Sequence, residues 1–292
     1  MYITYTNLPE EAMRKENSYH YDKFSVPFSC NFTTSYKAGN VDFHMHNSHE
    51  IYLLMDGHIQ YFVEDICYDM EPGSLILFSD REIHKAVNTA EAEFTRLVIH
   101  VNSSFVRPYC TPDTNLLNCF HREPGIGNLI LLSNEEYTSL VSMAQTLCNA
   151  MKNRRSFGSD LTATTTLLQI LIFVNSIWNK TSFSEASPKP HKAQAIMSYI
   201  DKNLTKPMTL DSISQDLSLD KYYISHLFKY ETESSIFQYI VVKRVALAKE
   251  LLLRGHTVAE ACHLSGFHDY SNFIRTFRKT TGYTPGQFKH MN

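Results

Sequence analysis

The residues best suited to chemistry lie close together in the first third of the chain. His44 and His46 stand two residues apart, Glu50 follows, and His84 comes after a Pro-Gly pair. Alternate side chains of a strand share one face, so both histidines would enter the interior of a barrel with Glu50 and His84. Imidazoles and a carboxylate suit Zn, Fe, Mn or Ni. Read as metal ligands, these four residues would allow a metal-dependent enzyme with a helical localisation domain.

The same positions suit a pocket that binds a small effector without a metal and without catalysis. Aromatic side chains would cover the apolar faces of a sugar, and His, Glu and Arg would fix its hydroxyls. The expected effector-binding residues are His44, His46, Glu50, Tyr52, Tyr61, His84 and Arg96. We favour this interpretation, which predicts no catalytic residue, no bound metal and no cofactor. His49, His58 and His100 are interpreted as surface or structural residues.

The spacing of these residues also resembles a known fold family. His44-x-His46-x3-Glu50-x6-Gly57, with His84 behind Pro72-Gly73, resembles the two cupin motifs. The surrounding pattern agrees, because short strands are expected at 25–36, 43–46, 50–57, 58–65, 66–71, 74–79 and 94–101, broken by Gly39, Asp56-Gly57 and Pro72-Gly73. Closely spaced short strands favour a small barrel or sandwich.

From Ser133 the apolar period becomes helical. Leu140, Met143, Ala144 and Leu147 follow the spacing i, i+3, i+4, i+7 of one helix face. A second helix, over 161–174, is apolar on too many sides for one neighbour. We therefore expect burial against a partner subunit, with 133–180 as a helical dimerisation segment of a homodimer.

Composition limits the class of protein. The 292 residues are 43% hydrophobic and 20% charged, with ten Gly and ten Pro, which excludes a collagenous, low-complexity or wholly disordered chain. The nearest approach to a membrane span, 167–178, is too short, and the N-terminus lacks a signal core, so a cytoplasmic protein with no membrane partner is expected. Six scattered cysteines without a CxxC pair are read as reduced thiols.

Charge divides the chain into two parts. From Lys189 onward, 14 Lys and Arg face nine Asp and Glu, a net charge of +5, whereas the preceding residues carry −8. This asymmetry is expected when one end meets a polyanion. Residues 181–191 concentrate Ser, Pro and polar residues, which predicts a linker.

The basic tail repeats itself at a spacing of 49 residues. The matched pairs are Phe228 and Phe277, Lys229 and Arg278, Thr232 and Thr281, Ser235 and Thr284, and Tyr239 and Phe288. Five pairs of similar chemistry in one register indicate a compact helical unit used twice.

Each copy follows a helix-turn-helix pattern, at about 209–230 and 257–280, with Asp220 and Asp269 as helix caps and a long helix, 237–254, between the units. Lys221, Lys229, Arg278 and Lys279 would contact phosphates, and Tyr222, Ser225, His226, Tyr270, Asn272 and Arg275 would face base edges. Simple solvated faces or a protein-interaction scaffold are the alternatives, and neither predicts DNA affinity that falls steeply with salt.

Residues 266–289, GFHDYSNFIRTFRKTTGYTPGQFK, closely resemble the signature of AraC/XylS-type transcription regulators. The resemblance implies a cytoplasmic activator that binds double-stranded DNA through the base-facing residues above, senses a small molecule such as a carbohydrate, and contacts RNA polymerase. Two positions depart from the pattern: Glu233 stands where the repeat usually has the glycine that Gly282 supplies, and Lys289 replaces a common Arg. A non-glycine there would either strain the C-terminal turn of the first unit's helix or require another cap.

The expected fold is a two-domain α+β protein. A cupin-like β-barrel over 1–132 senses the effector, and the helices of 133–180 follow it. After the linker at 181–191, an all-α DNA-binding domain with two helix-turn-helix units occupies 192–292.

Overall fold

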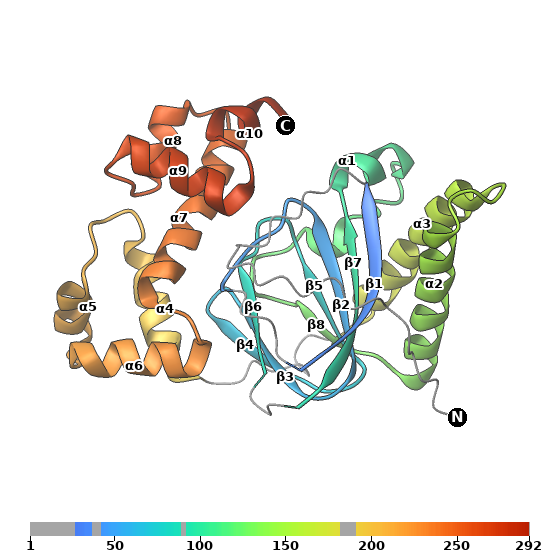
Figure 1. The fold of residues 1–292 in the computed structure, drawn as a ribbon, viewed down its shortest axis with the longest axis horizontal. Coiled ribbons are helices and arrows are strands. Elements are labelled where there is room, and N and C mark those ends of the chain that lie inside the picture. The colour runs from blue at the N-terminus through green and yellow to red at the C-terminus, as the bar shows by residue number, and fades with distance from the viewer. Residues whose placement is uncertain (1–26, 37–41, 89–91, 182–190, 292) are drawn as a thin grey trace.

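The computed structural model describes residues 27–36, 42–88, 92–181 and 191–291. Two sheets occupy the middle of the molecule, a pair of long helices covers one side, and the C-terminal helices lie on the other side (Figure 1). The predicted linker and the first 26 residues fall almost entirely outside the described residues.

The two sheets are antiparallel. The larger has the order β1-β7-β2-β5-β8, with strands β1 Phe28–Ser35, β7 Phe94–Val101, β2 His49–Asp56, β5 Ser74–Phe78 and β8 Leu129–Leu131. The smaller has the order β4-β3-β6, with β4 Ile66–Met70, β3 Ile59–Val63 and β6 His84–Val87. Within the described chain no ladder joins the two sheets, so the expected closed barrel is replaced by two facing sheets.

Strand parity divides the larger sheet into two faces. On β7, Leu97 and Ile99 belong to the apolar cluster shared with the long helices, whereas Phe94 and Val98 belong to the cluster between the sheets. On β2, Tyr52 faces the space between the sheets with Phe94 and Val98. Side chains that alternate with buried Leu and Ile therefore line the interior between the sheets.

Three segments differ from the expected strands. Residues 43–46 form a single bridge, in which His44 and His84 exchange two backbone hydrogen bonds, instead of a strand. Strands β6 and β8 were not expected, because four- and three-residue strands carry too few residues for a periodic signal.

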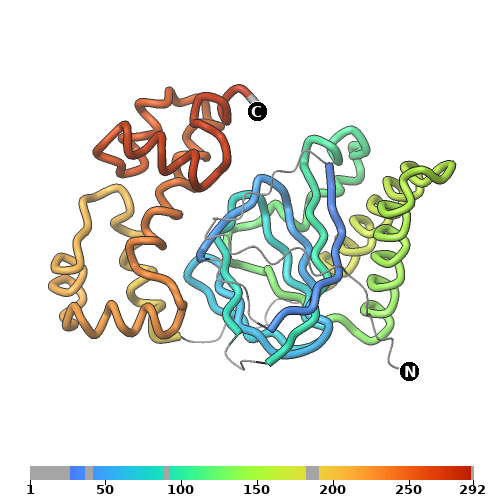
Figure 2. Tube along the Cα trace, in the orientation of Figure 1, coloured from blue at the N-terminus to red at the C-terminus, as the bar shows by residue number. Residues whose placement is uncertain are grey.

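Helices α2 Asn134–Lys152 and α3 Ser159–Trp178 pack on the outer face of the larger sheet (Figure 2). A capping box between Ser133 and Glu136 starts α2. Among the described residues, only α3 is long and apolar enough to span a membrane. Its buried side, which includes Leu167 and Ile170, packs in the core under the sheet and accounts for much of that apolarity. The shorter helical segments before α2 are α1 Ser103–Val106, η2 Arg107–Tyr109 and η3 Asn118–Phe120.

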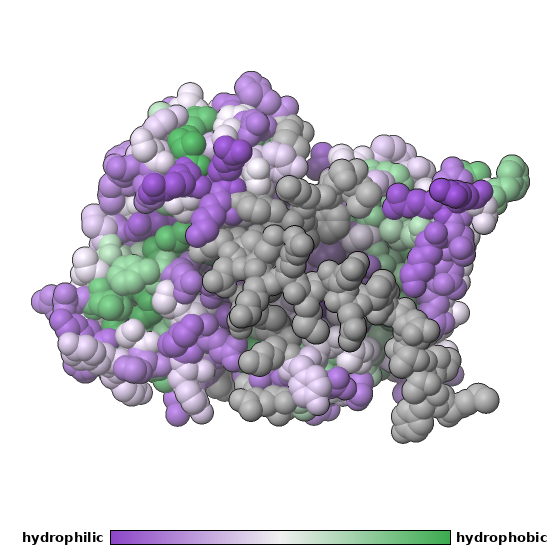
Figure 3. Space-filling view, viewed as in Figure 1, coloured by the Kyte–Doolittle hydropathy of each residue, from purple (hydrophilic) through white to green (hydrophobic). Residues whose placement is uncertain are grey.

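The C-terminal part is helical. Its helices are α4 Gln194–Asn203, α5 Leu210–Leu217, α6 Lys221–Thr232, α7 Ile236–Leu253, α8 Val258–Leu264, α9 Tyr270–Thr281 and α10 Pro285–Met291. Helices α5 and α6 form the first unit, α8 and α9 the second, and α7 runs between them (Figure 1). The space-filling view shows a largely hydrophilic surface over these helices, with hydrophobic areas on the left and near the top (Figure 3).

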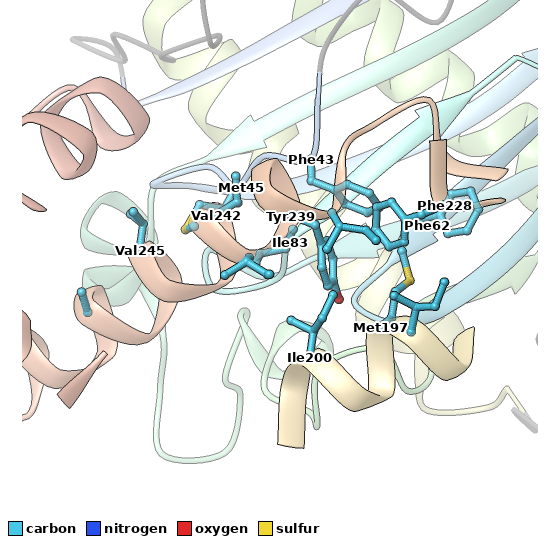
Figure 4. Close-up of a cluster of buried hydrophobic side chains, with 14 of the residues drawn as sticks. Phe43, Met45, Phe62, Ile83, Met197, Ile200, Phe228, Tyr239, Val242 and Val245 are labelled. Carbon is cyan, nitrogen blue, oxygen red and sulfur yellow. The ribbon is translucent and has the colours of Figure 1, made fainter. Parts of the chain in front are cut away.

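One apolar cluster joins the two parts of the molecule. Phe43, beside the His44 bridge, and Phe62 of β3 share this cluster with Tyr239 of α7, with ring centroids of Phe43 and Tyr239 4.8 Å apart. Met197 and Ile200 of α4 complete this contact (Figure 4). The C-terminal helices are thus packed against the sheets through a buried core.

Candidate nucleic-acid interface and sensor pocket

Helices α6 and α9 begin with the same cap. The Asp220 carboxylate accepts hydrogen bonds from the backbone N–H groups of Tyr222 and Tyr223, at 2.9 and 3.1 Å. The Asp269 carboxylate accepts one from Asn272, at 2.6 Å. An aspartate at this position accepts hydrogen bonds from backbone N–H groups that have no partner within the helix. Its negative charge also interacts favourably with the positive end of the helix dipole.

Both turns need a left-handed residue. Ser218 takes this conformation before α6, with φ 53°, and Gly266 takes it before α9, with φ 85°. At Gly266 a side chain is also excluded, since a Cβ atom would lie 2.8 Å from the carbonyl oxygen of Leu204. The second turn is therefore held tightly against the end of α4.

All ten residues expected to contact DNA are solvent-exposed: Lys221, Tyr222, Ser225, His226 and Lys229 on α6, and Tyr270, Asn272, Arg275, Arg278 and Lys279 on α9. The opposite side of each helix is buried, with Phe228 and Phe277 both 0% exposed. Each helix thus presents a continuous polar face while its aromatic residues anchor it.

Some of these residues already have partners within the protein. The Lys221 ammonium lies 3.0 Å from the Asp211 carboxylate, and Lys229 donates to the carbonyl oxygen of Glu233 at 2.7 Å. On α9, the Arg275 guanidinium donates to the side-chain oxygen of Asn272 at 3.1 Å. Each of these contacts engages a side chain that would have to reorient to contact DNA.

The four candidate residues of the sheet region do come together. His46 Nε2 lies 2.8 Å from a Glu50 carboxylate oxygen, and His84 Nε2 lies 3.6 Å from the same oxygen. The ring centroids of His44 and His84 are 4.5 Å apart. Glu50 and His84 are 4% and 0% exposed, so the cluster is sheltered from solvent.

A fifth residue, His100, also lies beside this cluster; it is buried rather than on the surface, which leaves its interpretation as a structural residue open. Its Nδ1 atom lies 3.9 Å from the Glu50 carboxylate, and its ring lies 4.7 Å from that of His46. The alternation of side chains along β7 could have predicted this position. Ile99 and Val101 face the helices, so His100 between them faces the other side of the sheet. By contrast, His49 is a structural residue that stacks on Phe120 and hydrogen-bonds to Ser103.

Electrostatics set the protonation of the cluster. Burial alone would raise the pKa of Glu50, but the imidazoles of His100 and His46 hold that pKa well below its usual range. Burial lowers the pKa of His44, and the neighbouring His84 and His46 lower it further. The Glu50 carboxylate is therefore stabilised in its ionised form, and the His44 imidazole in its neutral form.

This donor set fits a transition-metal ion. The nitrogen atoms of His44, His46 and His84 lie within 4.8 Å of one another, as do the donor atoms of His46, Glu50 and His100. Neutral imidazoles with one carboxylate are ligands that such ions prefer.

Aromatic residues extend the cluster between the sheets. Tyr52 and Tyr61 have ring centroids 5.1 Å apart, and Tyr61 lies 6.0 Å from the ring of His84. The Tyr52 hydroxyl has no hydrogen-bond partner in the part of the chain that the structure describes, and burial raises its pKa. Arg96 lies near the edge, where it donates to Ser35 at 3.1 Å.

The cluster borders directly on α7. The Lys249 ammonium donates to the backbone carbonyl oxygens of His46 and Asp80, both at 3.2 Å. Asp42 accepts hydrogen bonds from Ser234 and from Gln238, at 2.8 and 2.7 Å. The segment that carries His44 and His46 is therefore held between the pocket and the helix that joins the two DNA-binding units.

A second lysine of α7 forms an ion pair across the same boundary. Lys243 Nζ lies 2.6 Å from Glu64 of the sheet region and 2.9 Å from Asp201 of α4. Burial raises the pKa of Glu64, and the neighbouring Lys243 offsets this rise only in part. Burial lowers the pKa of Lys243, but the carboxylates of Glu64 and Asp201 outweigh this and raise it. We take the lysine as charged, because it faces two carboxylates at hydrogen-bond distance.

The sequence analysis did not single out these lysines. Lys249 stands in the apolar stripe of α7 with Val245, Ala248 and Leu252, at the spacing of one buried helix face. A charged residue in such a stripe indicates a buried polar contact. This pattern could have identified Lys249 from the sequence.

Comparisons with known proteins agree with this architecture. Residues 213–291 match the family described as a helix-turn-helix domain, and residues 32–171 match the AraC-like ligand binding domain. The chain is 32% identical over 96 residues to an uncharacterized HTH-type transcriptional regulator of Pseudoalteromonas carrageenovora, covering 33% of this chain and 57% of that protein. It is 30% identical over 110 residues to the bifunctional transcriptional activator/DNA repair enzyme AdaA of Bacillus subtilis, covering 37% and 52%. The matches thus span about half the length of these relatives.

Among solved structures, ToxT from Vibrio cholerae is 14% identical, with 91% of this chain and 99% of that chain covered and a TM-score of 0.37. The signature in residues 266–289 lies in the matched helix-turn-helix domain, whereas the matched ligand-binding domain is a separate part of the sequence. With both domain types present in one chain and in the expected order, the protein belongs to the AraC-type family of helix-turn-helix transcription regulators.

Proposed function

We propose that this protein is a sequence-specific DNA-binding regulator in which α6 and α9 enter successive major grooves. The observation that carries this proposal is the duplicated unit, since each copy has an aspartate-capped helix with a buried aromatic side and an exposed polar side. The rigid α7 fixes the spacing between the two helices. The proposed DNA binding supports a location in the cytoplasm.

Binding-site selection on the full chain tests DNA recognition. We expect one preferred sequence, with affinity that falls steeply as salt rises because counterions are released. The double variant His226→Ala/Arg275→Ala should lose preference for that sequence, and the matched control Arg155→Ala, which removes an exposed charge from the loop after α2, should keep it. Equal affinity for all sequences in the unmodified protein would refute sequence-specific regulation.

The finer proposal is that a small polar effector binds between the sheets. The Tyr52 and Tyr61 rings offer apolar faces, while the imidazoles, Glu50 and Arg96 offer hydrogen-bonding groups, a combination that suits a carbohydrate or related metabolite. Because His46, Glu50, Tyr52 and Tyr61 are each less than 10% exposed, an effector reaches them only if part of the protein moves, and we propose that this part is the segment of residues 42–47.

That displacement supplies a route from effector to DNA. Moving residues 42–47 breaks the hydrogen bonds of Lys249 to His46 and of Asp42 to Gln238, which tie the pocket to α7. Effector binding would then change how the two helix-turn-helix units are positioned for DNA. A ligand that binds one arrangement of the protein more tightly shifts the population toward that arrangement.

The pH dependence of this docking contact tests the coupling. Burial lowers the pKa of Lys249 to about 8, below its ordinary value of 10.5. A lysine with a lowered pKa opposes docking when protonated, so the docked arrangement should gain stability as the pH rises from about 8 towards 10.5. Limited proteolysis of the 181–191 linker across this range should slow in the unmodified protein, with no such trend in Lys249→Met. The same trend in both proteins would contradict the role of Lys249.

A panel of sugars, with operator affinity as the readout, tests the effector class. A binding sugar should shift operator affinity in the unmodified protein, and Tyr52→Phe, which removes one buried hydroxyl, should weaken sugar binding without changing affinity for DNA. No shift with any sugar would reject the carbohydrate class.

A second candidate ligand for the same cluster is a divalent transition-metal ion, which the two convergent donor sets favour. Either His44, His46 and His84, or His46, Glu50 and His100, would hold it. Metal analysis of the purified chain tests this idea. A stoichiometric ion that is lost in His46→Ala would support it. A metal-free chain that does not bind added Zn or Ni would rule it out.

We also propose that the protein is a homodimer through α2 and α3 and that it contacts RNA polymerase when bound at a promoter. The support for dimerisation is the exposed apolar side of α3, where Leu161 and Ile172 are 67% and 54% exposed. Sedimentation of the full chain should show a dimer that Leu161→Lys/Ile172→Lys converts to monomer. A monomer at working concentration in the unmodified protein would reject this part of the proposal.

A further inference from the structure

Two cysteines form a close pair on the far side of the larger sheet from the histidine cluster. Cys30 of β1 and Cys148 of α2 are 118 positions apart in the chain, yet their Sγ atoms lie 2.9 Å apart. The Cys148 thiol also lies 3.1 Å from the carbonyl oxygen of Cys30, and Cys30 Sγ lies 3.6 Å from that of Ala144. A disulfide has sulfurs about 2.05 Å apart, so about 1 Å of approach separates this pair from a covalent bond.

The environment of the pair is apolar and tightly packed. Cys30 and Cys148 are 7% and 6% exposed and belong to the cluster between the sheet and the long helices. Strand β1 lies at the edge of the larger sheet, next to α2 (Figure 2). A bond between these sulfurs would join two elements that are already in contact.

The two thiols differ in their chemistry. The hydrogen bond with Cys30 lowers the pKa of Cys148, and Lys152, one turn further along α2, lowers it further against the effect of burial. The contact with Cys148 and burial raise the pKa of Cys30. The thiolate is the nucleophile in cysteine oxidation, so Cys148 reacts first and Cys30 supplies the second thiol.

We propose that Cys30 and Cys148 are a modification site that a hydroperoxide converts into a disulfide. The Cys148 thiolate attacks one oxygen of the hydroperoxide, the O–O bond breaks, and the departing alkoxide or hydroxide takes up a proton, leaving a sulfenic acid on Cys148. The Cys30 sulfur then attacks the Cys148 sulfur, the S–O bond breaks, and the Cys30 proton leaves with the hydroxide as water. In the balance, two thiols and one hydroperoxide give one disulfide, one alcohol or water, and one further water.

The site is independent of the DNA-binding and effector-binding proposals, because it rests on two thiols that touch neither region. The disulfide would fasten the edge strand of the sheet to α2 and close a loop of more than one hundred residues. Such a cross-link restricts the unfolded chain and raises the temperature of unfolding.

The test is peptide mapping of the reduced full chain after treatment with one equivalent of hydrogen peroxide. The free thiols are then alkylated, and the chain is digested without reduction. We expect a cross-linked peptide pair containing Cys30 and Cys148, a higher unfolding temperature, and reversal of both by dithiothreitol. Cys30→Ser should leave a sulfenic acid on Cys148 that dimedone traps, and the matched control Cys110→Ser, which removes a partly exposed thiol, should still form the cross-link.

Two outcomes would overturn the proposal. One is full alkylation of Cys30 and Cys148 at a peroxide dose that oxidises Cys110. The other is oxidation of either cysteine to sulfinic acid without a cross-linked peptide.

Discussion

The two helix-turn-helix units have the same interior and different surfaces. Thr232 and Thr281, 49 positions apart, both donate a hydrogen bond to the carbonyl four residues earlier, at 2.7 and 2.9 Å. Each also accepts one from the backbone N–H two residues later. Ser235 and Thr284 then cap the next helix in the same way, each paired with a glutamine three residues on.

The exposed positions of the two units diverge. His226 corresponds to Arg275, Lys229 to Arg278, and Glu233 to Gly282. The exposed face of α9 therefore carries three cations, Arg275, Arg278 and Lys279, whereas that of α6 carries two lysines, Lys221 and Lys229. Packing constrains the buried residues of both copies alike, while the solvent-facing residues are free to specialise for different DNA contacts.

The largest expected effect tests the shared interior. Phe228→Ala and Phe277→Ala each delete a fully buried ring, and each should lower the free energy of unfolding of the C-terminal domain by about 3–5 kcal/mol. Urea denaturation of the full chain, followed by helical circular dichroism, measures both. A loss at one position more than twice that at the other would show that the two units are not packed equivalently.

The next effect concerns base recognition. Arg275→Ala should cost about 1–3 kcal/mol at one base-pair position if the guanidinium makes a bidentate contact with guanine. His226→Ala, at the corresponding position of α6, should cost less, because an imidazole makes fewer hydrogen bonds to one base. Competition assays with base-substituted operators measure the two losses, and equal loss on specific and random DNA would remove Arg275 from the base-reading residues.

A smaller effect separates the phosphate contacts. Arg278→Ala should weaken binding to all sequences and reduce the slope of log affinity against log salt by about 1. Lys229→Ala should change the slope less, since Lys229 already donates to the Glu233 carbonyl. Titrations at a series of salt concentrations measure both slopes, and a larger change for Lys229→Ala would reverse the assignment.

The smallest effect concerns the helix ends. Glu233 and Gly282 both take the left-handed conformation, with φ of 54° and 85°. Gly282→Ala should cost about 1 kcal/mol of stability, because a side chain disfavours that conformation. Glu233→Gly should gain a few tenths of a kcal/mol, since relief of strain is partly offset by the flexibility of glycine when unfolded. Thermal unfolding of the two variants measures both changes in stability. Destabilisation by Glu233→Gly would show that the Glu233 side chain makes a stabilising contact.

The expected strain at Glu233 does not stop α6 from ending as α9 does. The Glu233 N–H donates to the carbonyl of Lys229 at 2.9 Å, and the Gly282 N–H donates to that of Arg278 at 3.0 Å. The departure from the family pattern is therefore accommodated by a left-handed non-glycine residue at a local cost. Adjacent polar residues, Ser234 with Asp42 above all, hold this turn against the sheet region.

Local patterns determined a large part of this protein. The aspartate caps, the 49-residue repeat and the buried stripes of α6 and α9 depend on residues within a turn or two of one another, and these could be read directly. Residues 43–46 were misjudged as a strand because four alternating residues cannot show whether a partner strand is present. Their histidines still meet His84, through one bridge rather than a ladder.

Only the tertiary structure decided which distant residues meet. The sequence alone determined the two-domain organisation and the duplicated units, because periodicity and capping act over short distances. The addition of His100 to the histidine cluster, the hydrogen bonds of Lys249 to the pocket backbone and the pairing of Cys30 with Cys148 depend on strand register and helix docking. Those are set by the burial of whole apolar faces, a cooperative property of the packed chain that no single local pattern contains.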